Sequence, residues 1–211
     1  MTPVILRKSL LFSVALFLLA LAYGTTYYGM FSFFIVQEAF AVAAVLVIAP
    51  SMALSGISYF WKRYAPLLVY RKALGQIGLL FGLLHVAMAM LNNGVAYRAY
   101  TLDSVYDVSM VAGYLAVLLF VLMPFYSSVR TTRRIGGAKV RLALRYLGYG
   151  GYVFVLVHAT LLLWDDWMLW VATPSPILPP PTLVACVIGG LVLCLRMTLF
   201  FAQQKKKLVH K

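Results

Sequence analysis

The sequence predicts an all-α integral membrane protein, a bundle of six transmembrane helices with both termini on the cytoplasmic side. Its composition, its apolar segments and its charge distribution all point to this class. Of the 211 residues, 64% are hydrophobic and 11% are charged, whereas a soluble domain is about half apolar and about a quarter charged. The mean hydropathy of +0.92 also excludes a disordered chain, which needs low hydrophobicity.

Six apolar segments are long enough to cross a hydrocarbon core ~30 Å thick. Their hydrophobicity is continuous rather than alternating, which predicts helices and not barrel strands. The predicted helices cover residues 9–23, 36–58, 75–92, 108–126, 146–164 and 182–202 within a single transmembrane domain, 1–211. The first segment lacks a small-residue cleavage site followed by a polar chain, so we expect no cleaved signal peptide.

Basic residues set the expected orientation. The net charge is +13, and the basic residues lie between membrane-length segments rather than on a soluble face, so we expect no nucleic-acid partner. Seventeen of the 18 Lys and Arg residues fall on one side of the predicted bundle, and only Arg98 falls on the other. The positive-inside rule makes the basic side cytoplasmic. All five acidic residues lie at or near the opposite side: Glu38, Asp103, Asp107, Asp165 and Asp166.

Prolines and cysteines add detail to this topology. Pro50 and Pro124 lie inside the second and fourth predicted helices, where we expect kinks. The proline-rich segment 174–181 is predicted to be a stiff outer loop without helix. Cys186 and Cys194 share the last helix, too far apart along it to form a disulfide.

Two histidines lie deep within apolar helices, where ionisable groups are costly and usually functional. His85 is thirteen residues after Lys72, and His158 is thirteen residues after Arg145. At ~1.5 Å per residue, both imidazoles lie ~20 Å beyond the basic layer. Two imidazoles at one depth on different helices are a candidate pair of metal ligands. The third histidine, His210, lies in the Lys-rich tail, where we expect it to be solvated.

Small residues line the same helix faces as these histidines. Gly75, Gly78 and Gly82 precede His85 at helical spacing, and Gly148 and Gly151 precede His158 in the same way. Such faces leave room for a planar macrocycle, and haem iron takes axial imidazole ligands in helix bundles. Glycine faces also allow close helix packing. The residues alone therefore leave four alternatives open: haem, polar contacts between helices, a proton or ion path, and a structural metal such as zinc.

Several motifs resemble ferric-reductase-like transmembrane proteins, most closely the haem-binding membrane subunit of the bacterial periplasmic methionine-sulfoxide reductase system. The resemblance covers most of residues 40–165 and depends on the order and spacing of the motifs. These are Ile48-Ala49-Pro50, Arg71-Lys72-Ala73-Leu74-Gly75 before Leu84-His85, Gly113 to Pro124 with the basic segment Ser127 to Gly136, and Arg145-Tyr146-Leu147-Gly148-Tyr149 before Leu156-Val157-His158.

The resemblance implies a b-type haem with His85 and His158 as its iron ligands. Gly82 and Gly151 on the glycine faces, and Arg145, are the further candidate cofactor-binding residues. The family usually has a further histidine thirteen residues before the one matching His158, and here Arg145 stands at that position. We therefore expect one bis-histidine haem rather than two. A bis-histidine haem has no open coordination position, which suits electron transfer.

The implied function is an electron-transfer component of an oxidoreductase system in the bacterial inner membrane. Electrons would pass from quinol or a cytoplasmic flavin partner to an acceptor at the outer face, and quinone is a second candidate cofactor. The chain has no Gly-rich nucleotide motif of its own. Two further interpretations stay open: a structural or assembly subunit of a larger membrane complex, and a small proton or ion transporter using His85 and His158.

Three charged residues have two interpretations each. Arg145 and Arg196 are suited to pair a haem propionate or a quinone oxygen, or to snorkel to the inner interface. Glu38 is a candidate proton carrier for quinol chemistry, or a solvated residue near the start of a helix. For the tail Lys205–Lys207 we expect binding to anionic lipid.

Overall fold

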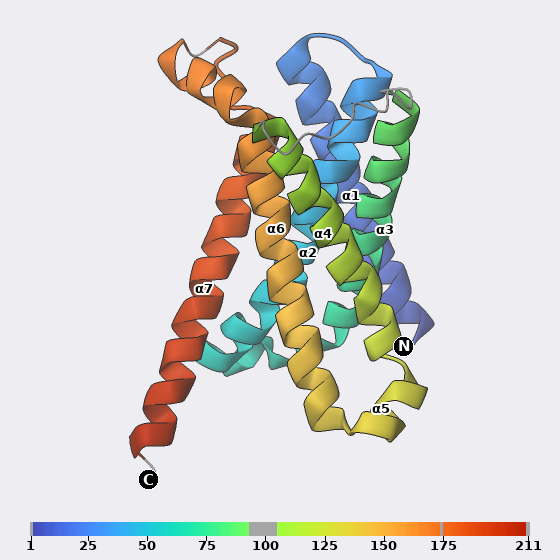
Figure 1. Cartoon of the computed structure of the whole chain (residues 1–211), viewed down its shortest axis with the longest axis vertical. Coiled ribbons are helices and arrows are strands. Elements are labelled where there is room, and N and C mark those ends of the chain that lie inside the picture. The colour runs from blue at the N-terminus through green and yellow to red at the C-terminus, as the bar shows by residue number, and fades with distance from the viewer. Residues whose placement is uncertain (1, 93–104, 174, 210–211) are drawn as a thin grey trace. The chain divides into compact units, whose positions relative to one another are not determined.

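The computed structural model describes residues 2–92, 105–173 and 175–209. Within these ranges the chain is all helical, and six helices are long and apolar enough to cross a membrane. The predicted all-α fold with six membrane-length helices is thereby confirmed, and the chain is a multi-pass membrane protein; the cytoplasmic position of the termini stays a prediction. The elements are α1 (Pro3–Tyr28), α2 (Phe33–Phe60), the 3-10 helix η1 (Lys62–Tyr70), α3 (Arg71–Asn92), α4 (Val105–Tyr126), α5 (Val129–Ile135), α6 (Gly137–Ala172) and α7 (Pro181–Val209) (Figure 1).

The six predicted membrane helices are correct in number and order. The predicted ends at residues 92 and 126 coincide with those of α3 and α4, whereas the other helix ends extend beyond the predicted ranges. The largest difference is α6, whose 36 residues correspond to ~54 Å of helix. Its first three turns carry Lys139, Arg141 and Arg145, which precede the predicted range 146–164. Its last turns carry Asp165 and Asp166. The charged ends extend the helix beyond the apolar segment from which it was predicted.

Local signals explain where several helices begin and end. The Ser32 hydroxyl accepts from the Ile35 amide (3.4 Å) at the start of α2, as expected of a helix N-cap. Gly29 ends α1 with a φ of 67°, a conformation that glycine adopts without strain. The prediction for segment 174–181 was wrong at Pro181, which is the first residue of α7, a favoured proline position. Pro174 lies outside the described residues, as do Arg98 and Asp103.

The chain divides into two compact units. Unit 1 comprises residues 1–85 and 180–211, and unit 2 comprises residues 86–179. Unit 1 therefore holds α1, α2, η1, most of α3, and α7, while unit 2 holds the end of α3 with α4, α5 and α6. The boundary falls directly after His85.

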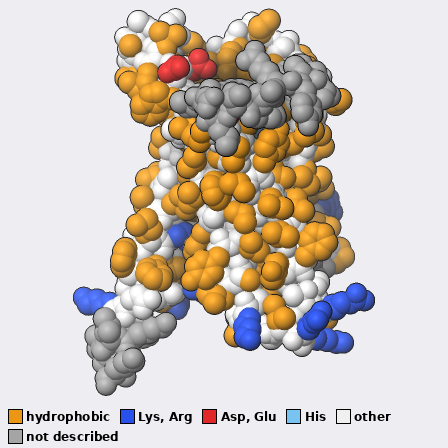
Figure 2. Space-filling model, viewed as in Figure 1, with side chains coloured by type: hydrophobic (Ala, Val, Ile, Leu, Met, Phe, Trp, Pro, Cys, Tyr) orange, Lys and Arg blue, Asp and Glu red, His pale blue; other side chains and the backbone are white. Residues whose placement is uncertain are grey.

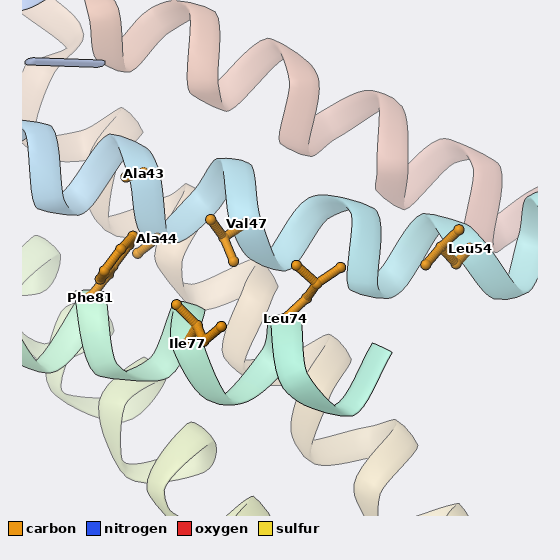
Figure 3. Packing of buried hydrophobic residues seen from close by; sticks show 7 residues of the cluster. All are labelled: Ala43, Ala44, Val47, Leu54, Leu74, Ile77 and Phe81. Atoms are coloured by element: carbon orange, nitrogen blue, oxygen red, sulfur yellow. The ribbon is translucent and has the colours of Figure 1, made fainter. Parts of the chain in front are cut away.

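Helix α2 forms the centre of unit 1. Its side chains are buried along most of its length, and it packs against α1, η1, α3 and α7. One apolar cluster joins Ala43, Ala44, Val47 and Leu54 of α2 to Leu74, Ile77 and Phe81 of α3 (Figure 3). Because glycine has no side chain, Gly78 brings α3 so close to α2 that an added Cβ would overlap Ile48.

The outward faces of the helices remain apolar. On the face in Figure 2, hydrophobic side chains cover the helices between their ends, and most of the visible Lys and Arg side chains lie near helix ends. Leu10, Leu11 and Leu19 of α1 and Leu118 of α4 are each at least 45% exposed. Apolar surface of this extent would be unfavourable in water and is what a lipid-facing helix presents.

Candidate functional site

His85 is anchored to α2. It lies on α3 and is half-buried, and its Nδ1 lies 3.0 Å from the main-chain oxygen of Gln37. A carbonyl oxygen only accepts, so Nδ1 carries the proton and donates it. The lone pair of the neutral imidazole is then on Nε2. This is the arrangement in which a metal-ligating histidine is oriented by a carbonyl partner.

His158 is anchored to α4 in the same way, within unit 2. Its Nδ1 lies 2.8 Å from the main-chain oxygen of Ser109, which again places the proton on Nδ1 and the lone pair on Nε2. The Ser109 hydroxyl donates to the main-chain oxygen of His158 (2.9 Å) and lies 3.1 Å from Nδ1. Ser109 is fully buried, at 0% exposure. One serine therefore holds both the backbone and the ring of His158.

Gly113 completes the seat of the His158 ring. It lies one helical turn after Ser109 on α4, and a Cβ added there would be 3.0 Å from Nδ1 and 3.2 Å from Cε1 of His158. These separations are shorter than ordinary van der Waals contact, so a side chain at 113 would displace the imidazole. Neither Ser109 nor Gly113 is predicted as a functional residue from the sequence. Their i, i+4 spacing of small residues was the available signal.

The glycine faces serve helix packing at most of their positions. Gly78 faces Ile48, and Gly151 lies against Phe120, whose ring would be 3.2 Å from an added Cβ. A Cβ at Gly148 would meet Met123 at 3.5 Å. At Gly82, by contrast, an added Cβ would meet no described atom within 4 Å. Close packing thus accounts for Gly78 and Gly151, while contact of Gly82 or Gly151 with a cofactor stays a prediction.

The three charged candidates have distinct surroundings. Arg145 is exposed on α6. Arg196 instead reaches across to α2, where its Nη1 donates to the main-chain oxygen of Met52 (3.4 Å) and to the Ser55 hydroxyl. Glu38 is only 9% exposed, so interfacial solvation was wrong for this residue, whereas its expected place near the start of a helix is correct, since it is the sixth residue of α2. It follows Gln37, whose carbonyl holds His85, directly along α2.

The two histidines lie in different units, and the structure fixes each of them within its own unit. Their equal depth, which was inferred from the spacing to Lys72 and Arg145, stays a prediction. Among the described residues, no group of three or more His, Cys, Asp or Glu side chains is placed to hold a metal ion.

Comparison with known proteins adds no assignment: no protein-family model matches the sequence, and no similar protein is found among curated proteins. The function is therefore inferred from His85, His158 and the residues that hold them.

Proposed function

We propose that the protein is a transmembrane electron-transfer component that binds one b-type haem through His85 and His158. One observation carries the proposal. On both residues the Nδ1–H is engaged by a main-chain carbonyl of a neighbouring helix, which puts the lone pair on Nε2 in each case. A polar contact between helices needs only one hydrogen bond, from either ring nitrogen. Ligation of a metal through Nε2 requires the tautomer that carries the proton on Nδ1.

The donor set suits the group. Two neutral imidazoles are the ligands of a six-coordinate haem, whose iron would supply one-electron chemistry. The protein's contribution is to position these ligands. Gln37 and Ser109 orient the two imidazole rings, Gly113 leaves room for the ring of His158, and Gly82 leaves space beside α3. Two histidine ligands would leave no open position for substrate at the iron, which favours electron transfer over catalysis.

The direction of transfer follows from the predicted topology and from the resemblance to ferric-reductase-like proteins. Electrons would enter from quinol in the membrane or from a cytoplasmic flavin partner, and would leave to an acceptor at the outer face. Arg145, which stands where that family has a further histidine, supports one haem rather than two. Entry from quinol, or from a partner subunit of a larger membrane complex, suits a chain with a single haem.

Absorbance spectroscopy of single variants tests the ligand assignment. In the purified protein, His85→Ala and His158→Ala should each abolish the six-coordinate b-type spectrum, while His210→Ala in the tail should leave it unchanged. A variant of either helix histidine that keeps a bis-histidine spectrum would show that another residue is the ligand.

A structural or assembly subunit is the second candidate, and the Ser109–His158 contacts favour it specifically. These hydrogen bonds join α4 to α6 without any cofactor. This alternative expects a colourless protein that is destabilised by His158→Ala. Electron transfer expects the wild-type protein to be coloured.

A further inference from the structure

The end of α6 opposite its basic end carries a group of exposed apolar side chains. Four lie on the last three turns of the helix and two follow it: Trp164, Met168, Leu169, Val171, Ile177 and Leu178. We name these six residues the apolar end of α6. Ile177 is 90% exposed. Apolar side chains that gather at a surface mark a contact with a protein, a ligand or a membrane.

The apolar end of α6 is held together by its own hydrogen bonds. The indole Nε1 of Trp170 donates to the main-chain oxygen of Pro176 (2.9 Å), which ties the segment after the helix to its last turn. The amide and the hydroxyl of Thr173 both donate to the main-chain oxygen of Leu169 (2.9 and 3.0 Å). Ile177 is therefore presented from a segment that is fixed to the helix.

One face of α6 continues the exposed apolar surface of the helix into this end. Val153, Val157, Trp164, Met168 and Val171 are all exposed. At 100° per residue they fall within about 60° of one another around the helix axis, so they form one stripe. Its first two members belong to the part of α6 that faces lipid. The same stripe runs on through the apolar end of α6, which favours lipid as the group that covers it.

Distances along α6 place this end at a membrane boundary. Arg145 and Trp164 are nineteen residues apart, or ~28 Å of helix, close to the ~30 Å thickness of the hydrocarbon core. With Arg145 at one boundary, Trp164 falls at the other, where indole rings are favoured. A straight helix would carry Ala172 ~12 Å further out. The last turns instead tilt away from the axis of the middle of α6 (Figure 1), which brings them closer to the membrane plane.

The charges of this end indicate which lipid it meets. Asp165 and Asp166 lie on the same turns and are exposed, and the sequence has no Lys or Arg between Arg145 and Arg196. Carboxylates are repelled by anionic headgroups and attracted by the ammonium group of a zwitterionic one. A zwitterionic phospholipid therefore suits both the apolar and the acidic side chains.

We propose that the apolar end of α6 lies in the headgroup layer of the membrane, against zwitterionic phospholipid, and anchors this end of the helix. His158 precedes Trp164 by six residues, or ~9 Å, so the anchor sets the distance of His158 from that boundary. The anchor does not depend on haem and is testable whether or not the protein binds one.

The test measures the surroundings of single labels on the full chain in vesicles of dioleoyl phosphatidylcholine. Cys186→Ala and Cys194→Ala remove the native thiols, and Met168→Cys or Ile177→Cys adds one for a nitrobenzoxadiazole fluorophore. Leu118→Cys on the exposed apolar face of α4 is the lipid reference, and Lys205→Cys near the end of α7 is the water reference. The quenchers are iodide on both sides of the membrane and phosphatidylcholine with a nitroxide at carbon 5 of its acyl chain.

Iodide should quench the labels at 168 and 177 about fivefold less than the label at 205, because interfacial helices bury their apolar face ~5–10 Å into the headgroup boundary. The lipid nitroxide should quench them at least as strongly as the label at 118. Iodide quenching equal to that at 205, without quenching by the nitroxide, would overturn the proposal. The apolar end of α6 would then project into water, as a surface for a soluble protein.

A change of lipid tests the charge argument separately. In vesicles of dioleoyl phosphatidylglycerol, nitroxide quenching at 177 should be weaker than in phosphatidylcholine, and Asp165→Asn with Asp166→Asn should restore it. Equal quenching in the two lipids by the chain that keeps both aspartates would contradict the preference for a zwitterionic headgroup.

Discussion

A histidine whose Nδ1–H is bonded to a carbonyl oxygen is fixed in both tautomer and ring orientation. His85 and His158 each meet this condition within their own unit. The carbonyls belong to helical residues, Gln37 and Ser109, and a carbonyl oxygen has a second lone pair that accepts a further donor. The orientation of each ring therefore costs its neighbouring helix no hydrogen bond.

Replacing Ser109 tests the anchor of His158. Ser109→Ala removes the hydroxyl that donates to the His158 carbonyl but keeps the Ser109 oxygen that accepts from Nδ1. We expect a loss of about 0.6 kcal/mol in the free energy of unfolding, typical of an interhelical hydrogen bond in a membrane, with haem binding retained. Thermal unfolding in detergent measures the first quantity and absorbance the second. A loss of all haem would mean that the hydroxyl itself holds the ring.

Replacing Gly113 tests the space around the same ring. Gly113→Ala places a methyl group against Nδ1, so we expect the Nδ1–Ser109 bond to lengthen and haem to be lost more readily. Gly190→Ala is the control, since an added Cβ there meets no described atom within 4 Å. Haem occupancy of the purified protein should be lower for Gly113→Ala than for Gly190→Ala. Equal occupancy would contradict the role of Gly113 in leaving room for the His158 ring.

The sequence indicated His85 and His158 through their depth, the glycines on their helix faces and the family resemblance, but it could not reveal their partners. Gln37 and Ser109 act through main-chain oxygens, which every residue type has, so no residue pattern marks them. Arg196 illustrates a different limit. Its hydrogen bonds to Met52 and Ser55 join two helices that are far apart in sequence. The sequence shows that Arg196 is a polar residue on an apolar helix, but not which helix it contacts.

At the scale of elements, the contact of α3 with α2 depends on Gly78. Gly78→Leu should separate the two helices and lower the free energy of unfolding by about 1–3 kcal/mol, the usual cost of overpacking. Gly82→Leu, one turn along the same helix, should leave the stability of the haem-free protein unchanged because no described atom lies near its added Cβ. If Gly82 faces the haem, Gly82→Leu should reduce haem occupancy. Denaturation and absorbance of the two variants separate these effects.

Element order was predictable because each transmembrane helix must be about 20 apolar residues long. Element ends were not, since backbone hydrogen bonding continues into polar residues once a helix has begun. Helix α6 shows this at both ends, where the helix continues beyond the apolar segment to include Lys139 and Asp166. Helix η1 and α5 lie in short basic connections that carry no membrane-length signal.

For the whole molecule, the charge distribution makes a topological prediction. The start of α1 and the end of α7 lie at the same end of unit 1 (Figure 1), and the positive-inside rule makes that end cytoplasmic. A green fluorescent protein fused to the C-terminus should fluoresce, and alkaline phosphatase fused there should be inactive. Active phosphatase with a dark fluorescent fusion would contradict the predicted topology and, with it, the proposed direction of electron transfer.

The central claim concerns the whole chain, because the two proposed ligands, His85 and His158, belong to different units. The most direct test is the haem content of the purified wild-type protein, expressed with haem available, combined with its reduced-minus-oxidised absorbance spectrum. The proposal predicts one haem per chain with a six-coordinate b-type spectrum. A colourless protein would contradict the proposed electron-transfer function, and two haems per chain would contradict the inference from Arg145 that the protein binds only one.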